Sequence, residues 1–203
     1  IIANSSVVMR VRVGAEPDRL PPDLKWRGVS LDHYDGRDWS NTRDHYRRLR
    51  RSSRFGGILV AEDRRDGENL IQQDIFLEPF SDVIFAAPEL ILITGEALNR
   101  TIMFQDGNDA IGVFRRIRGP LRYVVYSDLM SRAEKLAIPI EGSISEAIQD
   151  RYLQLPEIHP GIYQLVEEIT TGYTGSIERA LAIERFLVGN YGYSLDNRSA
   201  SAD

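Results

Sequence analysis

The chain has 203 residues, of which 42% are hydrophobic and 27% are charged, which is ordinary for a globular protein with a substantial core. Its net charge of −5 and isoelectric point near 5.3 argue against a general nucleic-acid-binding protein. It contains no cysteine, which excludes disulfides, thiolate metal sites and a cysteine nucleophile within these residues.

The first two-thirds of the chain are predicted to form short antiparallel strands. Residues 7–13 alternate apolar and basic side chains with one slip, as in a half-buried strand. The other predicted strands are residues 26–34, 55–61, 70–78, 83–86, 90–94, 101–105, 110–115 and 121–127. Their short length, and the Gly, Pro, Asp and Asn residues between them, are typical of an antiparallel sandwich or barrel.

Residues 42–54 interrupt this pattern with six arginines and no apolar period: Arg43, Arg47, Arg48, Arg50, Arg51 and Arg54. We predict a solvated loop whose charge is balanced by nearby acids. The alternative function of this cluster is contact with anionic lipid headgroups or with an acidic envelope polymer.

Beyond the last predicted strand the pattern becomes helical. Ser143-Ile-Ser-Glu146 predicts a capping box at the start of one helix. Pro160 suits the first position of the next helix, and Gly172 suits its C-terminal end. A third helix is predicted to be capped by Ser176.

Glu184 is the least expected residue of this third helix. With 3.6 residues per turn, it falls within the apolar stripe of Ile177, Ala180, Leu181 and Val188. An unpaired buried carboxylate is costly, so we expect an arginine or backbone amides beside it. Such a pair would either orient the helix or support a neighbouring active site.

Three phrases occur in a characteristic order: Trp26-Arg27-Gly28 with Leu31-Asp32-x-Tyr34-Asp35-Gly36-x-x-Trp39; Tyr152-Leu153-Gln154-Leu155-Pro156; and Ala180, Ile183-Glu184, Leu187 with Tyr191-x-Tyr193-Ser194-Leu195. Together they resemble the extracytoplasmic region of bacterial transglutaminase-like membrane proteins, which are protein-glutamine γ-glutamyltransferases or cysteine proteases. The resemblance implies a longer parent with membrane helices, this region on the periplasmic or cell-surface side, and a catalytic core. In that core a histidine-activated cysteine would form a thioester with the substrate, but this chain holds no counterpart of the catalytic residues.

We therefore expect an α+β fold. Residues 1–130 would form an antiparallel β-sandwich or barrel. Residues 131–203 would form a helical segment that begins a transglutaminase-like core and stops before its cysteine. Since large exposed apolar patches are disfavoured in monomers, these helices should pack against the β-domain or against a second copy of the chain.

The leading functional hypothesis is a non-catalytic module that positions the parent's core and its substrate. The alternative is an envelope module that binds glycan, peptidoglycan or protein, with Trp26, Arg27, Tyr34, Asp35 and Trp39 as candidate contacts. A purely structural interpretation of Tyr34-Asp35-Gly36 is a turn between packed aromatic residues. An independent enzyme is the weakest hypothesis, because the sequence has no G-x-S-x-G elbow and no paired metal-binding histidines.

We predict no catalytic residue, metal or cofactor, and no nucleic-acid partner. The expected partners are the parent's own core and membrane helices, and an envelope protein or glycan.

Overall fold

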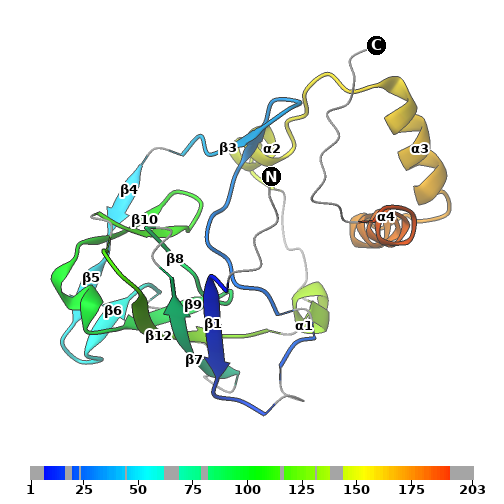
Figure 1. Ribbon diagram of the computed structural model, residues 1–203. Helices are drawn as coiled ribbons and strands as arrows, with labels where there is room; N and C mark the ends of the chain where they lie inside the picture. Colours follow the sequence, from blue (N-terminus) through cyan, green and yellow to red (C-terminus); the bar gives the residue numbers. More distant parts are fainter. Residues whose placement is uncertain are drawn as a thin grey trace. The chain divides into compact units, whose positions relative to one another are not determined.

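The computed structural model describes residues 7–16, 20–22, 24–43, 45–61, 69–78, 82–114, 117–130, 132–137 and 144–192 (Figure 1). The chain divides into two compact units. The first is Val7–Gln154, and the second begins at Leu155 and is described to residue 192.

The described residues of the first unit form three antiparallel sheets. The larger sheet has the order β1 (Met9–Val13), β7 (Leu70–Leu77), β12 (Leu121–Asp128), β9 (Leu90–Thr94), β6 (Gly57–Leu59) and β5 (Arg50–Ser52). A four-stranded sheet has the order β4 (Tyr46–Arg48), β10 (Met103–Asp106), β11 (Ile111–Val113) and β8 (Val83–Ile84). The third is the hairpin of β2 (His33–Tyr34) and β3 (Trp39–Ser40).

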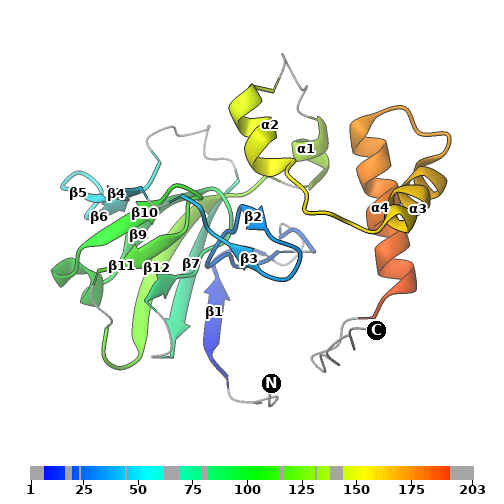
Figure 2. The same ribbon diagram turned by 90° about the horizontal axis from the view of Figure 1, so that it is seen from above.

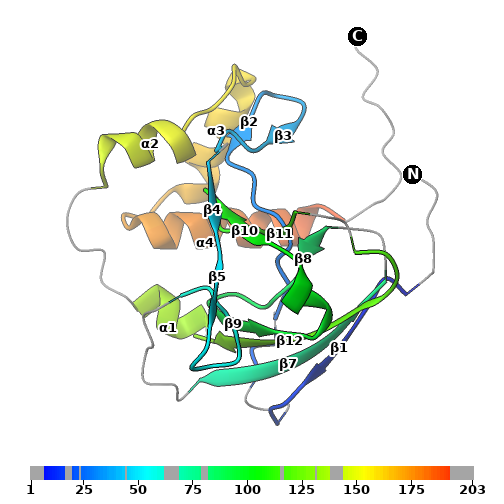
Figure 3. The same ribbon diagram turned by 90° about the vertical axis from the view of Figure 1, so that its left-hand side faces the viewer.

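The two larger sheets face each other across one core. Period-two alternation along β7 buries every second side chain, as expected of a strand with one face turned to a core. Ile75 and Val125 of the six-stranded sheet are fully buried and share a cluster with Met103 and Val113 of the four-stranded sheet. Figure 3 shows these two layers one above the other. The predicted antiparallel, sandwich-like β-domain with helices later in the chain is therefore confirmed as an α+β fold.

Two predictions about the strands are wrong. Residues 42–54 do not form a simple solvated loop but contain β4 and β5, which lie at the edges of the two larger sheets. Leu49, between these strands, is buried, and its amide donates to the carbonyl of Met103 at 2.9 Å. A single inward leucine among arginines gives almost no apolar period, which is why the strands were not predicted. Residues 26–34 form only an isolated pairing of Arg27 with Ala86, followed by β2.

The helices come after the last strand. The first unit continues beyond β12 through α1 (Arg132–Ala137) and α2 (Glu146–Tyr152), so the change from strands to helices does not coincide with the boundary between the units. A short 3-10 helix, η2 (Ala97–Arg100), joins β9 to β10. Ser143 lies outside the described residues, and the N-cap of α2 is Ser145, so Glu146 begins the helix rather than occupying its third position.

The second unit contains α3 (Pro160–Thr170) and α4 (Ser176–Asn190), which pack against each other. Pro160 does begin α3, and Gly172 lies just after its end with a φ of 85°, as predicted. The cap of α4 is Gly175 rather than Ser176, and its amide donates to the Glu178 carboxylate. Among the described residues, no helix is long and apolar enough to cross a bilayer.

Candidate functional site

Trp26-Arg27-Gly28 lies beside the segment between β8 and β9. The Arg27 amide donates to the Ala86 carbonyl at 2.8 Å, and the Ala86 amide donates back at 3.2 Å. Extended pairing directs neighbouring side chains to opposite sides. Gly28 is required by space, because a Cβ atom there would lie 2.5 Å from Cε1 of Phe85. The phrase thus combines a packed tryptophan, an arginine on the opposite side and a glycine that permits close approach.

Trp26 is a structural residue. Its indole packs half-buried against the main core, and Nε1 donates to Oε1 of the fully buried Gln73 at 3.0 Å. The same Gln73 oxygen accepts from the Ala87 amide, and its Nε2 donates to the Ser127 hydroxyl. That hydroxyl donates in turn to the Ala87 carbonyl at 3.0 Å. This network satisfies buried polar groups, so Trp26 is not available as part of an exposed aromatic platform.

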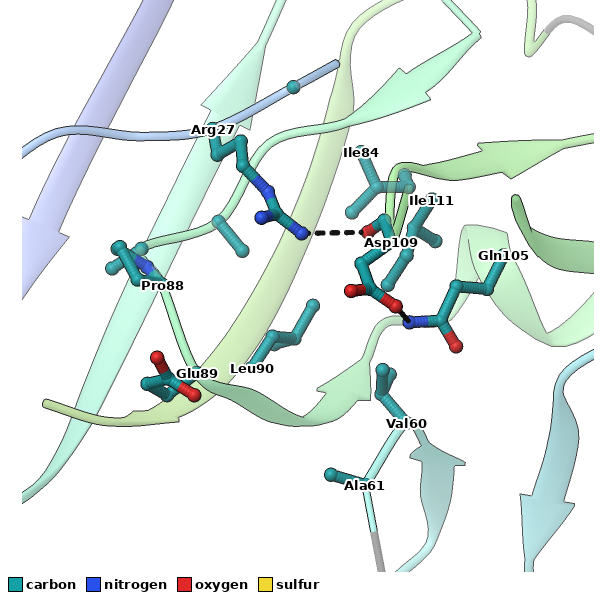
Figure 4. A pocket seen from close by; sticks show the side chains of 13 residues that line it. Arg27, Val60, Ala61, Ile84, Pro88, Glu89, Leu90, Gln105, Asp109 and Ile111 are labelled. Carbon is teal, nitrogen blue, oxygen red and sulfur yellow. Dashed lines mark hydrogen bonds between the residues drawn. The ribbon is translucent and has the colours of Figure 1, made fainter. Parts of the chain in front are cut away.

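Arg27 points to a pocket of about 320 Å³, which we call the Arg27 pocket. It is lined by Arg27, Gly28, Val60, Ala61, Ile84, Ala86, Ala87, Pro88, Glu89, Leu90, Gln105, Asp109 and Ile111 (Figure 4). Its volume is at the lower end of those of small-ligand sites. Charged and amide side chains line the pocket together with aliphatic ones, so the pocket can contact both polar and apolar groups.

The polar groups of the Arg27 pocket are held in place by one another. Nη2 of Arg27 donates to the Asp109 carbonyl at 3.1 Å, and Nε2 of Gln105 donates to Oδ1 of Asp109 at 2.8 Å. Figure 4 shows both bonds converging on Asp109. Oε1 of Gln105 accepts in turn from the guanidinium of Arg47. The chain of contacts leaves further N–H groups of Arg27 directed to no acceptor within the described residues.

Backbone strain is concentrated at this pocket. Within the described part of the chain, only two non-glycine residues have a positive φ, Glu89 at 54° and Asp109 at 65°, and both line it. Such conformations are uncommon outside glycine and cluster at binding sites. Among the described residues that line the pocket, the polar side chains are those of Arg27, Glu89, Gln105 and Asp109, which suit the binding of a polar group.

Tyr34, Asp35 and Trp39 form the β2–β3 hairpin. Oδ1 of Asp35 accepts from the amides of Arg37 and Asp38 at 2.8 and 2.7 Å, and these bonds lower the pKa of the exposed carboxyl. Gly36 has a φ of 102°, and the Tyr34 hydroxyl donates to its carbonyl. The Tyr34 and Trp39 rings stack at 5.1 Å, with Trp39 60% exposed. The turn interpretation accounts for every one of these contacts.

Asp32 joins the first two of the three sequence phrases, a role that the sequence did not reveal. Its carboxylate is buried and accepts from the amide and the hydroxyl of Thr42, both at 2.7 Å. Nε of Arg151 on α2 lies 3.9 Å from Oδ2, and Gln154 donates to the Asp32 carbonyl at 3.4 Å. We call this group, with Asn108, the Asp32 clasp. The clasp fastens α2 and the start of the Tyr152–Pro156 phrase to the sandwich.

The protonation of Asp32 is set by its contacts. Burial alone raises the pKa of this carboxyl, but the hydrogen bonds from the Thr42 amide and hydroxyl and from the Asn108 side chain outweigh burial and hold the pKa below its ordinary value of 3.8. Asp32 is therefore ionised at neutral pH. Asp35 binds its own turn instead, so Asp32 and Asp35 do not converge on a common ligand.

Glu184 does not lie where the helical stripe placed it. The side chain is exposed on α4, although it is not without a partner. The residue of α4 that is buried is Ala182, and Val188 of the predicted stripe is 78% exposed. The predicted burial of Glu184 is therefore wrong. Ile177 and Leu181 of the stripe are half-buried, but the packed face is centred on Ala182 and does not extend to Glu184.

About half of the large apolar side chains described in the second unit are exposed, and the others are only half-buried. Only Thr170 and Ala182 are buried among its described residues. The exposed apolar residues are Leu155, Ile162, Tyr163, Tyr173, Leu187, Val188 and Tyr191. Within this unit, two helices that pack on each other cannot cover all of their apolar faces.

Comparisons with known proteins agree with this architecture. A search of the curated proteins found no match. The periplasmic domain of TgpA from Pseudomonas aeruginosa is similar in structure, with a TM-score of 0.58, 20% identity, and coverage of 94% of this chain and 59% of that one. The same domain bound to ethylmercury matches with a TM-score of 0.57, 20% identity, and coverage of 94% and 60%. This chain thus spans about three-fifths of the solved domain.

The predicted extracytoplasmic location agrees with these structures, since both are of a periplasmic domain. The family model described as the TgpA N-terminal domain matches residues 1–133. That range holds the β-sandwich, the Trp26-Arg27-Gly28 phrase and every lining residue of the Arg27 pocket. The sequence resemblance to transglutaminase-like membrane proteins is thereby confirmed, and the chain belongs to the TgpA N-terminal domain family.

Proposed function

We propose that this chain is the non-catalytic N-terminal module of a transglutaminase-like enzyme, and that it positions the catalytic core and its substrate. The Asp32 clasp is the observation that carries the proposal. It fastens α2 to the sandwich at the start of the Tyr152–Pro156 phrase, from which the chain continues into α3 and α4. Because these contacts hold the segment just before α3 against the sandwich, the sandwich is well suited to fix the position at which a catalytic core begins.

The exposed faces of α3 and α4 support the same proposal. Tyr163, Val188 and Tyr191 are each more than half exposed. Burying large apolar side chains contributes about 1.5–3 kcal/mol each, so a packing partner for them is strongly favoured. We assign that partner to the remainder of a transglutaminase-like core. A second copy of this chain is the other candidate, and sedimentation of the isolated chain separates the two, since only the second predicts a dimer.

The Arg27 pocket is where we place contact with a substrate. Arg27 offers donors to a carboxylate or carbonyl, and the carboxylate of Asp109 offers an acceptor to an amine or amide. Ile84, Leu90 and Ile111 would cover an adjoining apolar side chain. A short peptide segment of a protein substrate presents all three kinds of group.

The test compares substrates of two sizes in the full-length enzyme. We expect Arg27→Ala to raise KM for amine incorporation into a glutamine-bearing protein while leaving kcat unchanged. The same variant should leave KM for a blocked glutamine dipeptide unchanged, because a dipeptide at the catalytic centre does not reach the pocket. Arg12→Ala, on the exposed side of β1, is the matched control. Equal effects of Arg27→Ala on both substrates, or none on either, would refute the assignment.

The alternative function is an envelope-binding module. One observation favours it: Trp39 is 60% exposed and stacked on Tyr34, which provides a small aromatic face for a sugar or peptide. The half-buried Trp26 does not extend this face. Sedimentation of the chain with purified peptidoglycan, with Trp39→Ala as comparison, tests the alternative. Loss of co-sedimentation in Trp39→Ala alone would favour it over the positioning role.

A further inference from the structure

The outer face of the four-stranded sheet carries large apolar side chains. Met103 and Val113 point into the core, so their neighbours Ile102, Phe104 and Phe114 point outward. Ile102 is 43% exposed and Phe114 is 69% exposed. The Phe114 amide donates to the Ile102 carbonyl at 2.8 Å, which keeps these two residues side by side.

Aromatic packing organises this face. The ring of Phe104 lies over Gly112, where a Cβ atom would be 2.7 Å from Cζ of that ring. Tyr46 on β4 is 61% exposed and meets Phe104 edge to face, with ring centroids 5.2 Å apart. The outer face is therefore an ordered apolar surface and not a set of scattered side chains.

Arginines border this apolar surface. Arg48 on β4 is paired directly with Phe104, and the hydrogen bond between Leu49 and Met103 continues the pairing to bring Arg50 level with Ile102. Leu49 is buried, so the side chains on either side of it, Arg48 and Arg50, face outward. We call the surface formed by Tyr46, Arg48, Arg50, Ile102, Phe104 and Phe114 the aromatic–arginine face.

The positive charge beside this face is not neutralised by an ion pair among the described residues: Asp106, opposite Tyr46 on β10, accepts from Asn41 and from the amides of Asn108 and Ala110, and not from an arginine. No acidic residue occurs from residue 45 to residue 61. Arg47 bonds to the Val60 carbonyl and to Gln105, while Arg51 bonds to Asn99 and to the Gly56 carbonyl, which are all neutral acceptors. Arg48 and Arg50 make no side-chain hydrogen bond or ion pair within the described part of the chain. This cluster is a concentrated positive region in a chain whose net charge is −5.

We propose that the aromatic–arginine face binds the surface of an anionic lipid bilayer. Guanidinium groups pair with phosphates, and exposed aromatic side chains are favoured at the boundary between headgroups and acyl chains. The observations favour a lipid surface over an acidic protein because the exposed Arg48 and Arg50 stand beside Phe114 and Ile102, which provide apolar groups that can enter the interface. The sandwich would then lie with β4, β10 and β11 toward the membrane. This inference does not depend on the proposed enzymatic role.

Figure 2 shows β4, β5 and β6 gathered at one end of the sandwich, with β1 toward the other. The strand order places β5 and β1 at opposite edges of the six-stranded sheet. Arg10 and Arg12 on β1 are also exposed. Replacing these two arginines by glutamate is the control, because it makes the same change in charge at the edge of the sheet opposite to the proposed interface.

The test measures co-sedimentation of the 203-residue chain with vesicles of phosphatidylcholine alone and with vesicles that also contain phosphatidylglycerol. We expect binding to the anionic vesicles only, weakening as salt rises from 0.05 to 0.5 M. Each arginine near an anionic surface contributes about fivefold in binding, so Arg48→Glu with Arg50→Glu should weaken binding by at least about 25-fold. Phe114→Ser should weaken it by about fivefold at both salt concentrations, because the contact that it removes is apolar.

The control pair Arg10→Glu with Arg12→Glu should bind almost as the wild type does, and circular dichroism should show that all variants are folded. Equal loss in the control pair would mean that net charge, and not this face, governs binding. Equal binding to neutral vesicles, or no binding to either kind, would overturn the proposal. Retention on an acidic polypeptide without retention on anionic vesicles would also overturn it, in favour of a protein partner.

Discussion

Asp32 provides the sharpest test of how the sandwich holds its first helices. Replacing Asp32 by alanine removes the acceptor of two 2.7 Å hydrogen bonds from Thr42 and leaves the guanidinium of Arg151 without its carboxylate. Asp32→Asn removes the charge but keeps an oxygen that can still accept from the Thr42 amide. We therefore expect both variants to be less stable at pH 7, with alanine the more damaging substitution.

The magnitude is set by the hydrogen bonds. A hydrogen bond to a charged group contributes about 1.5–3 kcal/mol, and a buried partner left unsatisfied costs about 1–3 kcal/mol. Asp32 borders a hollow of about 380 Å³ beside α2, so water replaces part of what is lost. We expect losses of about 2 kcal/mol for Asp32→Ala and about 1 kcal/mol for Asp32→Asn. For a domain of this size, the alanine value corresponds to a decrease in Tm of about 4–8 °C.

The pH dependence identifies the charge as the cause. The pKa of Asp32 is lower in the folded chain than its ordinary value of 3.8, so the folded state binds this proton more weakly than the unfolded state does. The stabilisation is therefore complete above pH 3.8 and is lost as the pH falls below that value through the folded pKa. We expect the difference in Tm between wild type and Asp32→Asn to shrink below pH 3.8.

The assay is thermal unfolding monitored by circular dichroism from pH 7 to pH 3, with hydrogen exchange of residues 146–154 at pH 7. Asp38→Asn, on the exposed turn of the β2–β3 hairpin, is the matched control and should change neither measurement. Exchange in residues 146–154 should accelerate in both Asp32 variants, since the clasp is what fastens α2. A constant difference in Tm across this pH range, or unchanged exchange, would refute the role given to Asp32.

Three further predictions concern the packing and the composition. Gly28→Ala should destabilise the sandwich by about 1–3 kcal/mol in urea unfolding, because the added Cβ atom would lie 2.5 Å from the Phe85 ring. The control is Gly189→Ala in α4, where an added Cβ atom has no neighbour within 4 Å, and it should be neutral or slightly stabilising. Gln73→Leu should lower the free energy of unfolding by about 2–4 kcal/mol, because it leaves the Trp26 and Ala87 donors unsatisfied. Gln72→Leu, on the exposed side of β7, should lower it by less than about 1 kcal/mol. Equal losses in the two variants would contradict the assigned network. The isolated chain, which has no cysteine, should incorporate no fluorescent amine into a glutamine-bearing protein above a blank without enzyme, and iodoacetamide should have no effect on it.

Features governed by local periodicity were predictable from the sequence. The alternation along residues 70–77 and 121–128 is the direct pattern of a strand with one buried face, and both are interior strands of the observed sheet. Pro160 and Gly172 act through backbone geometry alone, so they mark the ends of α3 in any tertiary context. The order of the three phrases was likewise sufficient to indicate the family.

Features that depend on which segments meet were not predictable. Arg48 and Arg50 belong to strands because β10 and β6 offer them hydrogen-bonding partners, although their side chains give no apolar pattern. Asp32 is buried because Thr42 and, 122 residues further along the chain, Gln154 pack against it. Glu184 is exposed because the packed side of α4, where Ala182 is buried and Phe186 is half-buried, is not the side that carries Glu184.

The sequence by itself determined the class of fold, the family and the absence of a cysteine nucleophile, since these rest on composition, local period and linear order. Only the tertiary structure decided that Trp26 is structural, that Arg27 lines a pocket with Glu89 and Asp109, and that Asp32 fastens α2. The physical reason is that burial, hydrogen-bond pairing and the pKa of a carboxyl are set by neighbours in space. A linear pattern specifies those neighbours only along one strand or one helix at a time.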